Sequence, residues 1–171
     1  MLEILKFTIP SVVILIGLYF VINKLFKQES ERRQFELYKL NRDVTLPIKM
    51  RAYERITLFL QRTSPESMLM RFDFSSLTVV QLQQMLLQSL RDEFEHNASQ
   101  QIYVSQKTWV MVLNARESIA QLINATAIHL NPQAPAIDLA QAILASYAAS
   151  DNPPTEIALE YLRSELKSIG L

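Results

Sequence analysis

The feature that most constrains this chain is an uncharged apolar run near the N-terminus, Phe7–Ile22, with the sequence FTIPSVVILIGLYFVI. Eleven of its sixteen residues are Leu, Ile, Val or Phe. With the apolar residues on either side, the run reaches about 20 residues, or roughly 30 Å of helix, which matches the hydrocarbon core of a bilayer. The sequence therefore predicts a transmembrane anchor over residues 1–26.

Two alternatives for such a run are a cleaved signal peptide and a buried core helix. A signal peptide begins with net positive charge and ends in small residues at the cleavage site. Here Glu3 and Lys6 cancel, and the first alanine of the chain is Ala52. A core helix with large apolar side chains on every face would need a much larger core around it. We therefore expect a single span that is retained.

Basic residues near the two ends of the run predict its orientation. Lys6 is the only basic side chain before the run, whereas five follow it closely: Lys24, Lys27, Arg32, Arg33 and Lys39. Because Lys and Arg are held on the cytoplasmic side, the N-terminus should face outward and residues 24–171 should lie in the cytoplasm. The alternative, a soluble domain that faces the periplasm as a scaffold, remains open at this point.

The overall composition excludes several classes of function. The chain has 17 basic and 17 acidic residues, but residues 24–71 hold 11 basic against 6 acidic, and residues 72–171 hold 5 against 10. Without cysteine there is no disulfide, no thiolate metal site and no cysteine nucleophile. With only two glycines, a Walker A loop and a Rossmann fingerprint are both impossible. An acidic half of the chain also argues against a nucleic-acid-binding protein.

Apolar periodicity and helix-capping signals predict an all-α fold, with one N-terminal transmembrane helix followed by a bundle of about five helices. The expected domains are the anchor 1–26, a juxtamembrane helix and loop 27–46, and an all-helical soluble domain 47–171. The loop is placed at Asn41–Pro47, because a proline disfavours helix in the residue before it.

In the soluble domain the periodicity of residues such as Ile56 and Phe59 predicts a helix at 48–62. Capping signals predict three further starts: a short helix after Ser64, one after Thr78 with Gln81 as its capping-box partner, and one from Ser105 to about residue 130. The last two helices are expected at 137–150 and from 155 to about 169.

Two surfaces are candidates for contact with a partner or with lipid headgroups. The first is the juxtamembrane helix together with the basic helix 48–62, through Lys49, Arg51, Tyr53 and Arg55. The second is the run from Trp109 to Leu113, which is apolar on all sides and therefore lies in the middle of a bundle or shows one face to a partner. Large aromatic residues and arginine are the usual anchors of protein interfaces. The alternative is that the basic residues only set membrane topology, which accounts for Lys24–Arg33 but less well for Lys49, Arg51, Arg55 and Arg62.

No candidate for catalysis, cofactor binding or metal binding stands out. Glu93-x-x-His96 has the spacing of a di-iron ligand pair, but a second pair is missing, because Thr126 lies three residues before His129. We therefore expect neither an enzyme nor a cofactor, and we identify no small-molecule substrate. The alternative is a helical-bundle enzyme or ligand-binding protein whose site is assembled from scattered polar residues.

The stretch Leu40–Pro47, LNRDVTLP, is followed by Arg51–Arg55, RAYER, behind the N-terminal apolar run. In this arrangement the chain resembles a family of uncharacterised bacterial single-pass inner-membrane proteins with a helical soluble domain and no assigned function. The resemblance covers most of the chain and implies a bacterial inner membrane, but no activity and no catalytic residue. We therefore expect a membrane-anchored helical adaptor or accessory subunit of an inner-membrane complex, which acts by binding other proteins there.

Overall fold

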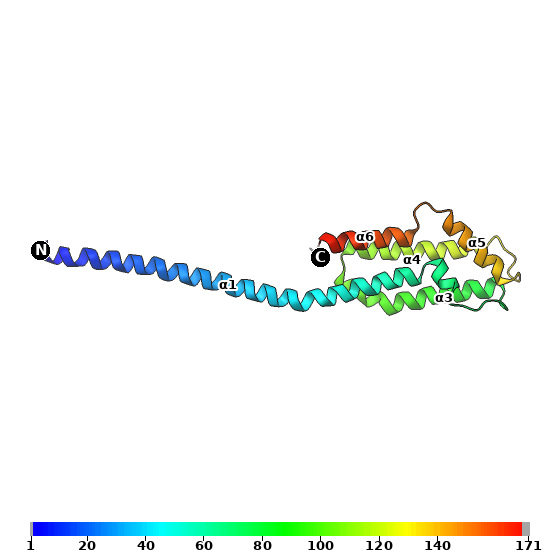
Figure 1. The fold of residues 1–171 in the computed structure, drawn as a ribbon, viewed down its shortest axis with the longest axis horizontal. Coiled ribbons are helices and arrows are strands. Elements are labelled where there is room, and N and C mark those ends of the chain that lie inside the picture. Colours follow the sequence, from blue (N-terminus) through cyan, green and yellow to red (C-terminus); the bar gives the residue numbers. More distant parts are fainter. Residues whose placement is uncertain (1, 169–171) are drawn as a thin grey trace. The chain divides into compact units, whose positions relative to one another are not determined.

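The structure is a computed structural model that describes the backbone of residues 2–168 and the side chains of residues 17–40 and 42–168. These residues form six α-helices and one 3-10 helix, without a β-strand, which confirms the predicted all-α class (Figure 1). The elements are α1 (Leu2–Arg62), α2 (Pro65–Leu69), α3 (Val79–Asn97), η1 (Ala98–Tyr103), α4 (Gln106–Ala127), α5 (Ala136–Ala148) and α6 (Pro154–Ser168).

The predicted span, Phe7–Ile22, falls within α1, but the side chains of residues 7–16 lie outside the described ones. Among the residues that the structure describes, no helix combines the length and the apolar content needed to cross a membrane.

The predicted loop at Asn41–Pro47 is wrong, because α1 continues as a helix from Leu2 to Arg62. Pro47 has no N–H, so the carbonyl of Asp43 loses its helical donor. Both residues are exposed, so water can hydrate that carbonyl and reduce the cost of keeping the helix. A proline disfavours the helical conformation at the residue before it without forbidding it. Here the loss of one hydrogen bond does not end the helix.

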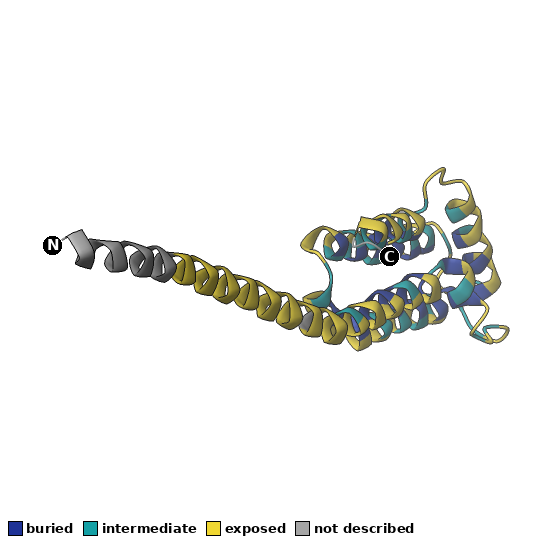
Figure 2. Ribbon diagram, turned by 60° about the vertical axis from the view of Figure 1, so that its left-hand side comes forward, coloured by how far each residue is buried: buried dark blue, intermediate teal, exposed yellow. Residues whose placement is uncertain are grey.

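The contacts within the chain divide it into two units, residues 1–47 and residues 48–171. In the first unit every described residue from 17 to 47 except Leu46 is exposed, as the colouring of this part of α1 in Figure 2 shows. Many of these exposed residues are large and apolar, among them Phe20, Phe26, Phe35 and Leu37. Within this unit the described apolar side chains of α1 are therefore largely exposed.

The second unit is a helical bundle with two hydrophobic clusters. One cluster joins α2, α3, α5 and the C-terminal half of α4, through buried residues such as Leu82, Leu86, Ile123 and Leu139. The other joins the last turns of α1, the N-terminal half of α4, and α6; its buried residues are Tyr53, Ile56, Phe59, Leu60, Val112, Ala115, Ala158 and Leu162. The helix α4 thus runs through both clusters, and α6 packs along it (Figure 1).

Short-range capping signals in the sequence correctly locate three helix starts. Ser64 accepts a hydrogen bond from the N–H of Ser67 at the start of α2, where Pro65 is the first helical residue. Gln81 accepts one from the N–H of Thr78, as a capping box requires. Ser105 accepts one from the N–H of Thr108 at the start of α4. In each case a side chain satisfies a backbone donor that the helix leaves without a partner.

Candidate functional site

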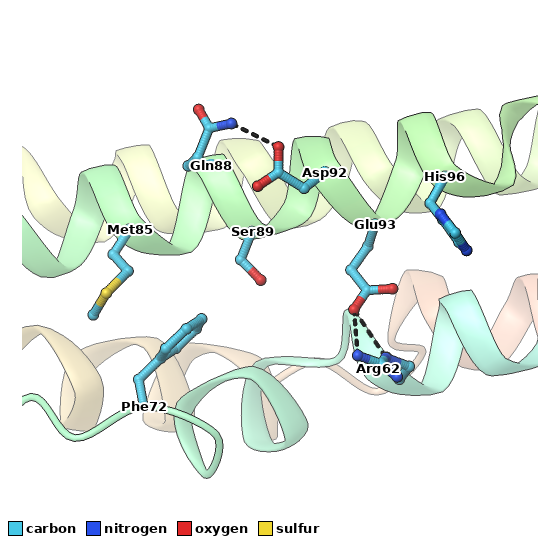
Figure 3. Close-up of a pocket in the computed structure, with 8 residues that line it drawn as sticks. All are labelled: Arg62, Phe72, Met85, Gln88, Ser89, Asp92, Glu93 and His96. Carbon is cyan, nitrogen blue, oxygen red and sulfur yellow. Dashed lines mark hydrogen bonds and ion pairs between the residues drawn. The ribbon is translucent and has the colours of Figure 1, made fainter.

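A groove of about 630 Å³ runs along α3 in the unit 48–171. Its lining comes from α3, from the last turn of α1 and from the segment after α2, through Arg62, Phe72, Met85, Gln88, Ser89, Asp92, Glu93 and His96. Figure 3 shows Met85, Ser89, Glu93 and His96 on the side of α3 that faces Phe72 and Arg62. Their spacing of four, four and three residues places all of them on one face of the helix.

At one end of the groove a single carboxylate oxygen holds two guanidinium groups. Glu93 Oε1 lies 2.7 Å from Arg62 Nη2 and 2.9 Å from Arg71 Nη1. A second nitrogen of Arg71 donates to the carbonyl of Arg62 at 2.9 Å, which satisfies a free acceptor at the C-terminus of α1. Two positive charges thus share one negative charge, and the side chain of Arg62 remains 56% exposed.

A third arginine extends this basic end toward His96. Arg55 Nη2 lies 3.1 Å from His96 Nε2. A guanidinium carries only donors, so Arg55 is the donor in any hydrogen bond between these two nitrogens. Arg55 and Arg62 are seven residues apart, two turns of α1, and therefore point to the same side of that helix. Arg62 therefore lines this end of the groove; Arg71 joins it through Glu93, and Arg55 through His96.

The other end of the groove is apolar. Met85 from α3 and Phe72 from the segment after α2 face each other across it (Figure 3). Gln88 donates a hydrogen bond of 2.6 Å to Asp92, and Figure 3 shows this pair on the side of α3 away from Arg62. Asp92, which also lines the groove, therefore bonds to Gln88 and forms no direct ion pair with Arg62 or Arg71.

A second polar cluster lies where α1, α4 and α6 meet. Glu165 on α6 accepts hydrogen bonds from the Tyr53 hydroxyl at 2.6 Å, from the Ser105 hydroxyl at 2.9 Å and backbone N–H at 3.2 Å, and from the Thr108 hydroxyl. Burial alone would raise the pKa of Glu165, but the donors Thr108, Tyr53 and Ser105 together outweigh it and lower the pKa. Burial, with the bond to Glu165, raises the pKa of Tyr53. Through these hydrogen bonds Glu165 links α6 to α1 and to the start of α4.

The structure separates the predicted contact residues into different environments. Lys49, Arg51 and Arg55 are exposed on α1, and Arg55 also reaches the groove through His96. Tyr53, in contrast, is only 2% exposed and binds Glu165, so it belongs to the core and not to the contact surface. The signal that identifies it is its spacing from Ile56 and Leu60, three and seven residues along the same buried face.

Trp109 is half-buried, and its ring lies 5.7 Å from that of Phe94, which lies 6.0 Å from that of Phe59. In the run Trp109–Leu113 only Val112 is buried, and Val110 is 43% exposed. The sequence left two positions open for this run: the middle of the bundle, or one face shown to a partner. The side of the run that carries Val112 lies in the bundle, whereas the side that carries Val110 is exposed. Trp109 joins α4 to the aromatic pair of α1 and α3.

The pair Glu93 and His96 does not recruit further ligands among the described residues, which contain no group of three or more His, Cys, Asp or Glu side chains able to hold a metal ion. Glu93 is occupied by Arg62 and Arg71, and His96 by Arg55. The groove thus offers guanidinium donors at one end and apolar surface at the other.

Comparison with known proteins gives a family. The model of a family described as "Family of unknown function (DUF7935)" matches residues 1–169. The chain therefore belongs to this family, in agreement with the resemblance to an uncharacterised family. Neither a curated protein nor a solved structure matches the chain.

Proposed function

We propose that this member of the family of unknown function DUF7935 is a membrane-anchored helical adaptor or accessory subunit of a bacterial inner-membrane complex. The observation that carries the proposal is the exposed apolar surface of α1. Phe35, Tyr38 and Val44, in the unit 1–47, are 69%, 69% and 66% exposed. Exposed apolar side chains gathered in this way are typical of surfaces that another molecule covers.

The apolar run Phe7–Ile22 supports an anchor at the start of the same helix. Its length suits a bilayer, and the basic residues that follow it favour a cytoplasmic bundle. The bacterial inner membrane comes from the family resemblance of Leu40–Pro47 and Arg51–Arg55. In this proposal residues 1–26 lie in the membrane and residues 48–171 bind partners on its inner side.

The exposed basic residues Lys49, Arg51 and Arg55 support a contact with an acidic protein surface or with anionic headgroups. A cytoplasmic leaflet attracts each basic residue close to it by about 1 kcal/mol. Charge reversal at Arg51 and Arg55 should therefore have a large effect on association, because it replaces attraction with repulsion.

The proposal is tested by gentle detergent extraction of the full chain and identification of the proteins that remain with it. The variant with Arg51→Glu and Arg55→Glu should lose those proteins, or lose its contact with anionic vesicles. The matched control is Arg91→Glu with Lys107→Glu, which makes the same charge change at exposed positions of α3 and α4. Retention of both kinds of contact by the first variant would remove the basic face from the proposal.

Orientation has its own test. The chain has no cysteine, so Ser150→Cys, at an exposed position between α5 and α6, creates a unique thiol. In intact cells a membrane-impermeant maleimide should leave this thiol unlabelled until the cells are opened. Labelling before lysis would support the periplasm-facing scaffold instead.

A further inference from the structure

We infer that the groove along α3 is a docking site for an extended peptide segment of a partner protein, one that carries a large apolar side chain and a carboxylate about four residues apart. The inference rests on the proposed function, because it assigns a partner chemistry to an adaptor. It concerns a surface made only of residues in the unit 48–171.

The charge of the groove selects an acidic partner. Arg62 and Arg71 share the single oxygen Glu93 Oε1, and Arg55 contacts His96. Asp92 also lines the groove but bonds to Gln88, so the excess of guanidinium groups over carboxylates lies around Glu93. Because a guanidinium has five N–H donors and Arg62 is more than half exposed, a partner carboxylate can be bound without breaking the pairs to Glu93.

The opposite end selects an apolar side chain. Phe72 and Met85 are both half-buried, so each presents part of its surface to the groove. Methionine is flexible and polarisable, and it adapts to aromatic side chains of different shape. A phenylalanine or leucine of the partner would cover the apolar surface that Phe72 and Met85 leave open.

The dimensions favour a peptide over a small metabolite. Met85 and Glu93 are eight residues apart on α3, which is about 12 Å along the helix axis. An extended chain covers this distance in about four residues. The groove is open along its length, whereas small-molecule sites enclose most of the ligand surface. Ser89, a small residue halfway along, leaves room for the backbone of the peptide.

The experiment measures binding of fluorescent peptides to the purified full chain in mild detergent, by fluorescence polarisation. The main probe is an octapeptide with phenylalanine four positions before an Asp-Glu pair, together with the same peptide in reverse order. Three control peptides carry Lys-Lys in place of Asp-Glu, alanine in place of phenylalanine, or the two features directly adjacent. We expect binding of the main probe in at least one direction, at least about tenfold weaker binding of each control, and weakening by salt.

Two variants test the position of the site. Ser89→Trp fills the middle of the groove without a change of charge, and Arg62→Gln removes one guanidinium while Arg71 still pairs with Glu93. Each should weaken binding of the main probe by at least about tenfold. The matched control is Gln84→Trp, at an exposed position of α3 about 140° around the helix from Ser89. Circular dichroism melting establishes that each variant is folded before it is compared.

The inference is overturned if neither direction of the main probe binds, if the lysine peptide binds equally well, or if both folded variants bind as the wild type does. Displacement of the probe by anionic lipid vesicles, with binding unaffected by phenylalanine, would assign the basic end to headgroups and also overturn it. Because purified protein and peptide suffice, the result is independent of the membrane. An adaptor that loses its partners on reversal of Arg51 and Arg55 would stand even without peptide binding here.

Discussion

Two stretches of the same helix, residues 17–47 and residues 48–62 of α1, use similar side chains in opposite ways. In the first, Phe35 is 69% exposed; in the second, Phe59 is 1% exposed and sits in the cluster with α4 and α6. Both stretches are rich in charged residues and both carry an apolar residue every few positions. The difference lies in burial: residues 48–62 pack their apolar side chains in the bundle, whereas the described side chains of residues 17–40 and 42–47 are almost all exposed.

The comparison shows why the function proposed here depends on the first stretch. A helix in water derives most of its stability from packing an apolar face, and the described side chains of residues 17–40 and 42–47 are exposed except that of Leu46. The proposed adaptor role accounts for this exposure, because it places another molecule on the apolar side chains. Residues 48–62 pack their apolar side chains against α4 and α6, and their exposed residues, such as Lys49 and Arg51, are basic.

The largest predicted effect separates the two phenylalanines. Phe59→Ala removes a fully buried ring and should lower the free energy of unfolding of the bundle by about 3–5 kcal/mol. Phe35→Ala, in the same helix, should change it by less than about 0.5 kcal/mol. Urea unfolding of the purified full chain, followed by circular dichroism, measures both. An equal loss for the two variants would contradict the exposure of Phe35 and end the comparison.

The next effect concerns the apolar run itself. Leu15→Arg places a charge near its centre, which costs about 2.5–3.5 kcal/mol for a helix in a bilayer. We expect a clear shift of the protein from the membrane fraction to the soluble fraction. Leu58→Arg, at an exposed position in the bundle, is the control and should leave the distribution unchanged. An identical distribution for both variants would argue against an anchor at residues 1–26.

Sequence reasoning succeeds where the signal is local. Ser64, Thr78 and Ser105 mark helix starts correctly, because a capping side chain acts on a backbone group only a few residues away. Periodicity likewise identifies buried faces, such as that of Ile56 and Phe59. The loop predicted before Pro47 is wrong, although its signal is also local. A proline only disfavours helix at the residue before it, and an exposed helix whose free carbonyl is hydrated can continue through it.

The candidate site could be found only in part. Arg55 is prominent in the sequence, but its approach to His96, 41 residues away, depends on how α1 and α3 pack. Glu165 and Tyr53 are 112 residues apart, and no pattern in the sequence connects them. Side chains that act together across helices are brought together by tertiary packing, which a single sequence without homologues does not specify.

A smaller predicted effect tests how the second stretch is held. Glu165→Gln removes the charge that accepts hydrogen bonds from Tyr53, Ser105 and Thr108, and should lower the free energy of unfolding by about 1–3 kcal/mol. Ser164→Ala is the control, because its hydroxyl bonds only to the nearby carbonyl of Tyr161. Thermal melting at neutral pH measures both. Equal melting temperatures for Glu165→Gln and the wild type would show that this cluster does not stabilise the bundle.

The same cluster predicts a pH dependence of stability. The folded pKa of Glu165 is lowered, so its contribution is present above the unfolded value of about 4.3 and is lost as the pH falls through the folded pKa. The folded pKa of Tyr53 is raised, so its contribution is present below about pH 10 and is lost as the pH rises beyond it. Melting temperatures of Glu165→Gln should therefore fall less than those of the wild type below about pH 4.3. Parallel curves in acid would refute the role of this carboxylate.

The smallest effect is expected at Pro47, where the two stretches of α1 join. Pro47→Ala restores the N–H that can bond to the carbonyl of Asp43, so hydrogen exchange of the amides around residues 44–51 should slow. The bundle gains no packing from this change, so its free energy of unfolding should stay within about 0.5 kcal/mol of the wild type. Thr45→Ala is the control, since it also raises helix propensity but restores no hydrogen bond. Slower exchange in both variants alike would attribute the effect to propensity. Slower exchange in Pro47→Ala alone would show that residues 17–47 and 48–62 are one helix with a single missing bond, and that the contrast between them comes from their surroundings.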